Sequence, residues 1–196
     1  SDRNPKEGDQ RETGAFANNV RVGTWSHFDW KGRSLGTAEY EGGKAVRGEK
    51  IAWHPNGKRA YQGRWTLDGE EGLCVTFFEH GGLSLSATYA RGVREGAFAR
   101  HHENGQVAEQ GAYRAGLKDG RWKLTFADGA LCEEGPYVAD AKDGAWSESG
   151  GTGSWRSTGR YKAGSRDGRW DTVDAKGQRS WDVYRDGLVV GSGRER

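Results

Sequence analysis

The chain contains too few hydrophobic residues to build a thick interior. Only 33% of its 196 residues are hydrophobic, and 33 residues are glycine, which loses more backbone entropy on folding than any other residue. No apolar run approaches the roughly 18 residues that mark a membrane-spanning helix. Nine tryptophans and only three prolines argue against disorder. We therefore expect a thin fold in which aromatic side chains supply most of the buried area.

Methionine and an excess of charge of one sign are also missing. Lys and Arg number 30 against 28 Asp and Glu, a net charge of +2, which argues against a nucleic-acid surface. The locally basic stretch 91–102 is interpreted as a solvated face. Because the chain begins at Ser1 and has no methionine, we expect a trimmed chain, from which any signal or lipoprotein leader would have been cut off.

What the chain has instead is a glycine that returns every 24 residues. These anchor glycines are Gly48, Gly72, Gly96, Gly120, Gly144 and Gly168, with Gly23 standing 25 residues before the first. An aromatic residue follows each of the first six by 17 positions: Tyr40, Trp65, Tyr89, Tyr113, Tyr137 and Tyr161. A fixed period of this length marks a repeat architecture. Repeats build extended surfaces more often than active sites.

One repeat predicts two strands joined by a tight turn. Apolar and polar residues alternate along Arg121–Phe126, and Leu131–Val138 forms the return strand. The pair Asp128-Gly129 between them is a strong hairpin signal. No segment shows a helical apolar stripe with caps. We predict an all-β fold: an elongated, single-layer, twisted antiparallel sheet of about seven stacked β-hairpin repeats, with half-repeats at both ends.

The position of the turn fixes the register. It pairs each central aromatic with a glycine across the hairpin: Trp122 with Gly135, Trp146 with Gly159, and Phe98 with Gly111. The next turn predicts that Tyr113 stands opposite Trp122. We expect each ring to cover the glycine that faces it, which gives one face of the sheet a structural ladder. The ladder comprises Trp25, Phe98, Trp122, Trp146, Trp170, Tyr89, Tyr113, Tyr137 and Tyr161.

The repeats leave no room for a separate domain. We expect a flexible polar segment at residues 1–12, a repeat domain at 13–191 and a C-terminal tail at 192–196. The sixth repeat is degenerate, and Ser147–Ser154 predicts a weak strand with a loose tip.

These motifs resemble the MORN repeat in its bacterial, YwqK-like variant. The family pattern is matched by Glu95-Gly96-Ala97-Phe98, Asn104-Gly105-Gln106-Val107, Gly111-Ala112-Tyr113 and Gly116-Leu117-Lys118-Asp119-Gly120. The resemblance covers nearly the whole chain and departs where Lys50 replaces the first aromatic and in the sixth repeat. It implies stacked antiparallel hairpins. It also implies a role as a scaffold, a membrane-associated module or a protein-binding surface. Proteins of this family are often labelled antitoxins, and nothing in these residues supports that function.

No constellation of catalytic or metal-binding residues stands out. His54 and His102 share one repeat slot, roughly 20 Å apart by strand spacing, which is too far for one metal. The acids before the anchor glycines recur in repeat after repeat, as a turn role requires and a catalytic role does not. Cys74 and Cys132 lie beyond disulfide reach of each other. We expect no enzyme activity, no cofactor and no metal.

The slot five residues after each anchor faces away from the ladder and varies along the chain. It is aromatic in the N-terminal half and fades toward the C-terminus, which favours a binding stripe. The predicted partner-binding residues are Phe28, Ile51, Trp53, Val75, Phe77 and His101. The alternative is that these side chains fill the concave side of a twisted sheet.

Two classes of function remain open. The first is a non-catalytic scaffold that binds another protein through the aromatic stripe. The second is a module of the cell envelope that binds a glycan or, less favoured because the charges are mixed, a lipid surface. Open terminal edges can pair with a second copy. The polar opening suits a bacterial extracytoplasmic lipoprotein, and the unpaired cysteines suit the cytoplasm equally.

Overall fold

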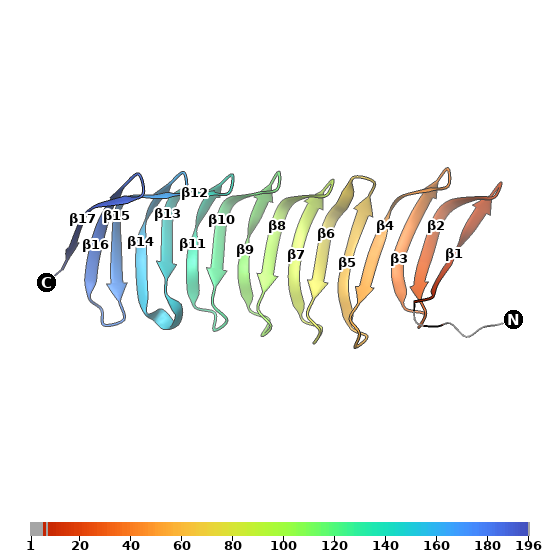
Figure 1. The fold of residues 1–196 in the computed structure, drawn as a ribbon, viewed down its shortest axis with the longest axis horizontal. Helices are drawn as coiled ribbons and strands as arrows, with labels where there is room; N and C mark the ends of the chain where they lie inside the picture. Colours follow the sequence, from red (N-terminus) through yellow and green to blue (C-terminus); the bar gives the residue numbers. More distant parts are fainter. Residues whose placement is uncertain (1–5, 7, 196) are drawn as a thin grey trace. The chain divides into compact units, whose positions relative to one another are not determined.

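The computed structural model describes residue 6 and residues 8–195, and it confirms the predicted fold class. The described chain forms seventeen β-strands and one short 3-10 turn, and the strands run antiparallel in an open meander of regularly spaced hairpins (Figure 1). The chain divides into two compact units, Ser1–Val93 and Arg94–Arg196.

In the first unit each strand pairs with the strand that follows it. The strands are β1 (Gln10–Ala17), β2 (Val20–Asp29), β3 (Ser34–Glu41), β4 (Lys44–Trp53), β5 (Arg59–Thr66), β6 (Gly69–Phe77) and β7 (Leu83–Ala90). Strand β1 begins inside the segment 1–12 that the sequence assigns to a flexible opening; residues 1–5 and 7 of that segment lie outside the described residues.

The second unit continues the same pattern, except that one strand pairs with both of the two strands that follow it. Its strands are β8 (Val93–His101), which begins at the unit boundary, β9 (Val107–Arg114), β10 (Leu117–Thr125), β11 (Leu131–Val138), β12 (Ala141–Lys142), β13 (Gly144–Ser149), β14 (Trp155–Lys162), β15 (Ser165–Asp174), β16 (Arg179–Arg185) and β17 (Leu188–Arg194). The tip of the degenerate sixth repeat is the 3-10 turn η1 (Gly151–Gly153).

Side chains of the turns bond both their own turn and the next one. The Asn104 carboxamide oxygen accepts a hydrogen bond from Gln106 N at 3.0 Å, and its Nδ2 donates to the carbonyl of Ala127, 23 residues on. Asn56 repeats both contacts in the first unit, with Lys58 and Glu79. These residues therefore fix the turn and also fasten each repeat to its successor.

The predicted register across the hairpins is confirmed. Trp122 stands opposite Gly135, Trp146 opposite Gly159, and Phe98 opposite Gly111. The predicted position of Tyr113 is wrong, because Tyr113 stands opposite Lys118. A bulge shifts the pairing: Gly120–Trp122 together stand opposite the single residue Gly111. Gly120 has φ +75°, a conformation that glycine adopts without a side-chain clash, so the anchor glycine is the residue that makes the bulge.

Because of this bulge, the indole covers a different glycine from the one expected. A methyl group added at Gly111 would overlap the ring of Trp122, so this ring lies over the preceding strand and not over Gly135. Its Nε1 donates a hydrogen bond to the carbonyl of Ala112 at 3.1 Å. The same arrangement holds for Trp25 over Gly14, Trp146 over Gly135 and Trp170 over Gly159. Trp122, Trp146 and Trp170 are at most 2% exposed.

A cation covers the outer side of the central ring in five repeats. The charged group and the ring centroid are paired as follows: Arg21 with Trp25 at 4.5 Å, Arg94 with Phe98 at 5.5 Å, Lys118 with Trp122 at 4.2 Å, Lys142 with Trp146 at 4.2 Å, and Arg166 with Trp170 at 4.1 Å. Each cation precedes its ring by four residues. The tyrosines of the ladder pack edge-on against the same rings, as Tyr113 does against Trp122 at 5.0 Å. A single layer of sheet thus buries a tryptophan between backbone, tyrosine and an alkyl-chain cation.

Substitution of Gly135 tests the contact between ring and backbone. Gly135→Ala is expected to destabilise the protein by about 1–3 kcal/mol, because the new methyl group overlaps the Trp146 ring while the backbone of Gly135 suits any residue. Urea unfolding measures the change. Gly191→Ala is the matched control, since its methyl group meets only the edge of Trp181 at 4.0 Å. Equal midpoints for the two variants would contradict the packing described.

Candidate binding surfaces

The structure places five of the six predicted partner-binding residues on one face of the first unit. Strand alternation and register put Phe28, Ile51, Trp53, Val75 and Phe77 on the face opposite the Trp25 ring. Ile51 and Val75 both stand opposite Gln62 on β5. Ile51 is 9% exposed, and the other four are half-buried. His101 lies in the second unit, where its Nδ1 is buried with no hydrogen-bond partner among the described residues.

Trp53 has a structural contact that the sequence does not reveal. Its indole N–H donates to the carbonyl of Ser34 at 2.7 Å, and the guanidinium groups of Arg33 and Arg59 lie 5.4 and 5.7 Å from its ring centroid. In the second unit, Thr125 and Ser149 occupy the same repeat slot and donate to the carbonyls of Val107 and Leu131. Donation to the preceding return strand is therefore one role of this slot. Phe28 and Phe77 have no donor group and do not share it.

A mixed-charge depression of about 640 Å³ lies beside the stripe on the same face. Its lining includes Thr24, Thr37, Glu39, Arg47, Glu49, Arg64, Thr66 and Glu71. Arg47 bonds both carboxylate oxygens of Glu39 at 2.7 Å, and this contact lowers the pKa of that carboxyl. Gln62, between Ile51 and Val75, donates to Glu49 at 2.5 Å and so joins the apolar stripe to the charged lining. The face combines apolar side chains with both signs of charge.

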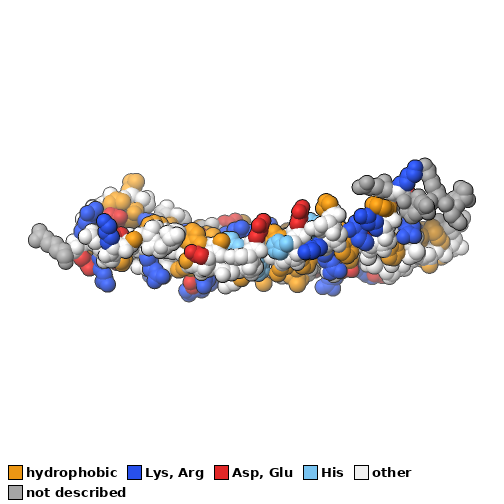
Figure 2. Space-filling model, turned by 90° about the horizontal axis from the view of Figure 1, so that it is seen from below, with side chains coloured by type: hydrophobic (Ala, Val, Ile, Leu, Met, Phe, Trp, Pro, Cys, Tyr) orange, Lys and Arg blue, Asp and Glu red, His pale blue; other side chains and the backbone are white. Residues whose placement is uncertain are grey.

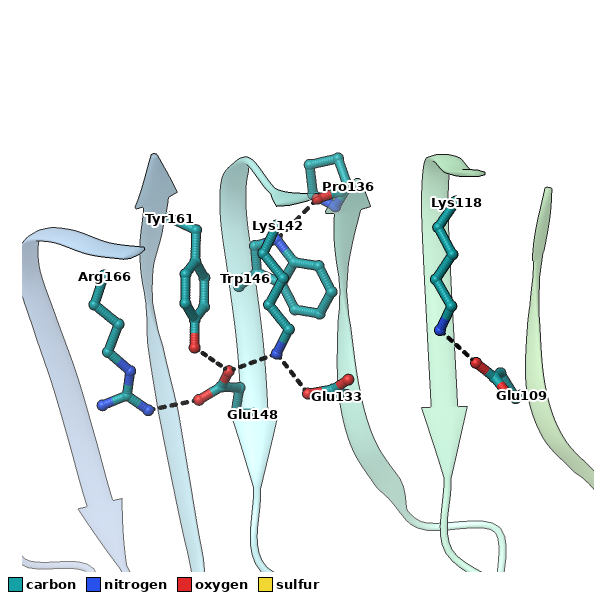
Figure 3. A network of polar contacts seen from close by, with 9 residues as sticks. All are labelled: Glu109, Lys118, Glu133, Pro136, Lys142, Trp146, Glu148, Tyr161 and Arg166. Carbon is teal, nitrogen blue, oxygen red and sulfur yellow. Dashed lines mark hydrogen bonds and ion pairs between the residues drawn. The ribbon is translucent and has the colours of Figure 1, made fainter. Parts of the chain in front are cut away.

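The second unit contains a network of buried charge next to Tyr161 (Figure 3). Glu148, which is 8% exposed, accepts from Tyr161 at 2.8 Å, from Lys142 at 3.0 Å and from Arg166 at 2.6 Å. Lys142 also donates to Glu133 at 2.6 Å. Burial raises the pKa of Glu148, and these three hydrogen bonds more than offset the effect, so its pKa lies below its usual value. Burial raises the pKa of Tyr161, whose phenol stays neutral and can donate.

This network repeats in simpler form and is explained by packing. Glu109 accepts from Lys118 at 2.6 Å just as Glu133 accepts from Lys142, and both lysines cover tryptophan rings. A carboxylate placed thus nine residues before a capping cation holds the cation over the ring. In the sequence, this arrangement is marked by a basic residue four positions before each central aromatic. The hairpin pattern alone did not identify these residues as capping cations.

The histidines and the acids before the anchor glycines also have structural contacts. A ring nitrogen of His54 lies 2.8 Å from the carbonyl of Phe77, and His102 makes the same contact with Thr125. Asp143 accepts from the backbone N–H of Ala163, and Glu71 and Glu95 make the same contact in their repeats, with Arg91 and Ala115. These acids therefore fasten the next repeat's turn, whereas the sequence predicts that they serve their own turn. Both cysteines are free.

Within the described part of the chain, no group of three His, Cys, Asp or Glu side chains is arranged to hold a metal ion. The described residues also contain no helix long and apolar enough to cross a membrane. Comparison with protein-family models finds no match to this chain, and comparison with curated proteins finds none. The case for function therefore depends on the surfaces themselves.

Substitution of Glu148 tests whether the network stabilises the fold. Glu148→Gln is expected to lower stability at pH 7 by about 1–3 kcal/mol, since it leaves Lys142 and Arg166 partly buried with one ion-pair partner fewer. A carboxyl whose pKa is lowered on folding stabilises above its ordinary value of 4.5 and loses this contribution as pH falls through the folded value. The gap between variant and parent should therefore narrow below about pH 4.5.

Urea midpoints measured at pH 7, 5 and 3.5 check this expectation. The exposed Glu103 gives the control, because Glu103→Gln removes the same charge without touching the network. A gap that stays constant over this pH range would show that the carboxylate charge is not what stabilises the second unit.

Proposed function

We propose that this chain is a non-catalytic, MORN-like repeat scaffold of the bacterial YwqK-like kind that binds another protein through the aromatic-bearing face of its first unit. The antiparallel hairpins of fixed period support the MORN-like assignment. In each unit most of the ladder face is occupied by packing that holds the sheet together. The opposite face of the first unit is freer to serve a partner.

The observation that carries the proposal is the composition of that opposite face. Phe28, Trp53 and Phe77 lie on β2, β4 and β6, alternate strands whose spacing is about 10 Å. Trp53 is held in place by Ser34 and two arginines, so its ring loses little freedom when it is covered. The charged depression adjoins this apolar stripe. Aromatic anchors bordered by paired charges are typical of protein interfaces.

Glycan binding is the second candidate, because half-buried aromatic rings can stack on sugar rings. A lipid surface is favoured less, since membrane binding requires clustered basic residues. Basic and acidic side chains are mixed in the lining of the depression beside the stripe. Figure 2, which views the molecule from below, likewise shows them interspersed with hydrophobic side chains. A protein partner accommodates this mixture better than an anionic membrane does.

Removal of two stripe rings tests the proposal. The double variant Phe28→Ala, Phe77→Ala should retain less than about a tenth of the partner recovered by affinity capture from the native host, because buried aromatic anchors dominate binding energy. Trp53 is left intact, since its truncation would also remove the bond to Ser34. Quantitative mass spectrometry of the captured proteins is the measurement, made well below the unfolding midpoint of the variant.

The matched control is Leu188→Ala, Val190→Ala, which removes two exposed apolar side chains from the second unit. It should recover the partner in full. Equal recovery by both double variants would overturn the proposal. Binding in a carbohydrate pull-down or in liposome flotation, with no captured protein, would support the second candidate instead.

A further inference from the structure

Two repeats of the first unit depart from the packing scheme at all three positions: the repeat of Gly48, which has Thr37, Val46 and Lys50 there, and the repeat of Gly72. In the scheme, a tryptophan follows the carboxylate by 13 residues and the capping cation by four. The sets are Glu12, Arg21 and Trp25; Glu109, Lys118 and Trp122; and Glu133, Lys142 and Trp146. In the repeat of Gly72 the same three positions hold Tyr61, Glu70 and Cys74. The ring is moved to the carboxylate position, and the cation is replaced by an acid.

The contacts at this repeat follow from the exchange. Gly63 corresponds to the glycines that lie beneath indole rings elsewhere, and here the Tyr61 hydroxyl and the Cys74 thiol cover it. The carbonyl of Arg64 corresponds to those that accept from indole N–H groups, and its contact is with Cys74 Sγ at 3.9 Å. The phenol and the thiol together are smaller than an indole with its capping cation. A hollow therefore remains on the ladder face of the first unit.

This hollow has a volume of about 490 Å³ and is lined by Lys50, Ala52, Tyr61, Trp65, Gly69 and Glu70. Trp65 occupies the slot that is tyrosine in the other ladder repeats, and Glu70 stands directly opposite it across the strand pair. Glu70 is exposed and forms no ion pair with any described residue. Two aromatic rings and an unpaired carboxylate thus border one opening.

We propose that this hollow binds the guanidinium group of an arginine side chain presented by a partner polypeptide. The guest guanidinium would lie over the Trp65 ring and bond to Glu70, beside the Lys50 ammonium that already lies over the Tyr61 ring. The second unit shows the same chemistry within the chain: Arg166 lies 4.1 Å from the Trp170 ring centroid and donates to Glu148 at 2.6 Å. A planar guanidinium both stacks on an aromatic face and pairs with a carboxylate.

The positive charge of Lys50 distinguishes a cationic guest from an anionic one. Lys50 lines the hollow, its ammonium lies over the Tyr61 ring at 6.0 Å from the centroid, and it forms no ion pair with the described residues. It repels a cationic guest and attracts an anionic one. Removal of this charge should therefore strengthen the binding of arginine. The hollow is on the face opposite the aromatic stripe, so its occupancy does not depend on the function proposed above.

The test is an NMR titration of the whole chain with acetyl-Gly-Arg-Gly-amide, monitored at the Trp65 indole N–H and the Gly69 amide. We expect saturable shifts with a dissociation constant on the order of 1 mM. The uncharged acetyl-Gly-Gln-Gly-amide should shift neither signal. Glu70→Gln should weaken binding about fivefold, and Lys50→Gln should strengthen it about twofold.

Asp68→Asn is the control, since it removes the same charge as Glu70→Gln from the neighbouring turn, outside the lining, and Asn-Gly suits a tight turn as well as Asp-Gly does. It should leave the affinity within about twofold of the parent. An unchanged amide spectrum away from the hollow verifies the fold of each variant.

Three outcomes would overturn the proposal. The first is an equal response to the arginine and glutamine peptides, and the second is no saturable shift. The third is weaker binding in Lys50→Gln together with a response to acetyl-Gly-Glu-Gly-amide, which would show that the hollow takes an anion. None of these outcomes affects the capture experiment on the aromatic stripe.

Discussion

Four repeats depend on an indole ring that lies flat against the backbone of the preceding strand: those of Trp25, Trp122, Trp146 and Trp170. This contact requires two glycines with different tasks. Gly111 leaves room for the ring of Trp122, whereas Gly120 takes the positive φ that creates the bulge and turns the ring toward Gly111. The indole N–H then satisfies a strand carbonyl, so a large side chain is buried without leaving its polar atom unpaired. In these four repeats the two glycines are thus what allows a single layer of sheet to bury a tryptophan.

The hairpins and their register were predictable from sequence because both are local. Asp128-Gly129 fixes the turn, and alternation along Arg121–Phe126 assigns the faces. The same counting could not predict which glycine the Trp122 ring covers. A bulge opposite Gly111 adds two residues to one strand, and the ring therefore lies over the preceding strand and not over the following one. A strict period-two count predicts that Tyr113 pairs with Trp122. Because of the bulge, Tyr113 pairs with Lys118 instead.

For the candidate surfaces too, the sequence predicts local features but not the contacts between neighbouring repeats. Which side of β4 and β6 carries Trp53 and Phe77 follows from alternation, and the sequence predicts it correctly. That Trp53 donates to Ser34 depends on the spacing between neighbouring repeats, which no single hairpin pattern contains. The capping cations are similar: Lys118 and Lys142 read as ordinary surface charge until the tryptophans beneath them are seen to be buried.

The two faces of such a sheet carry different information about function. Differences in residue type between repeats are expected on a solvent-facing side of the sheet, because few contacts constrain the side chains there. The ladder face is constrained by ring, carbonyl, cation and carboxylate at once, and a change at one of these positions alone should leave a buried group unpaired. At Tyr61, Glu70 and Cys74 all three side-chain positions differ together, and the result is well packed over Gly63 yet open at its outer side. A concerted change of this kind keeps the fold while exposing two rings and an acid. The hollow is therefore an indication of a binding role that is independent of the aromatic stripe on the opposite face.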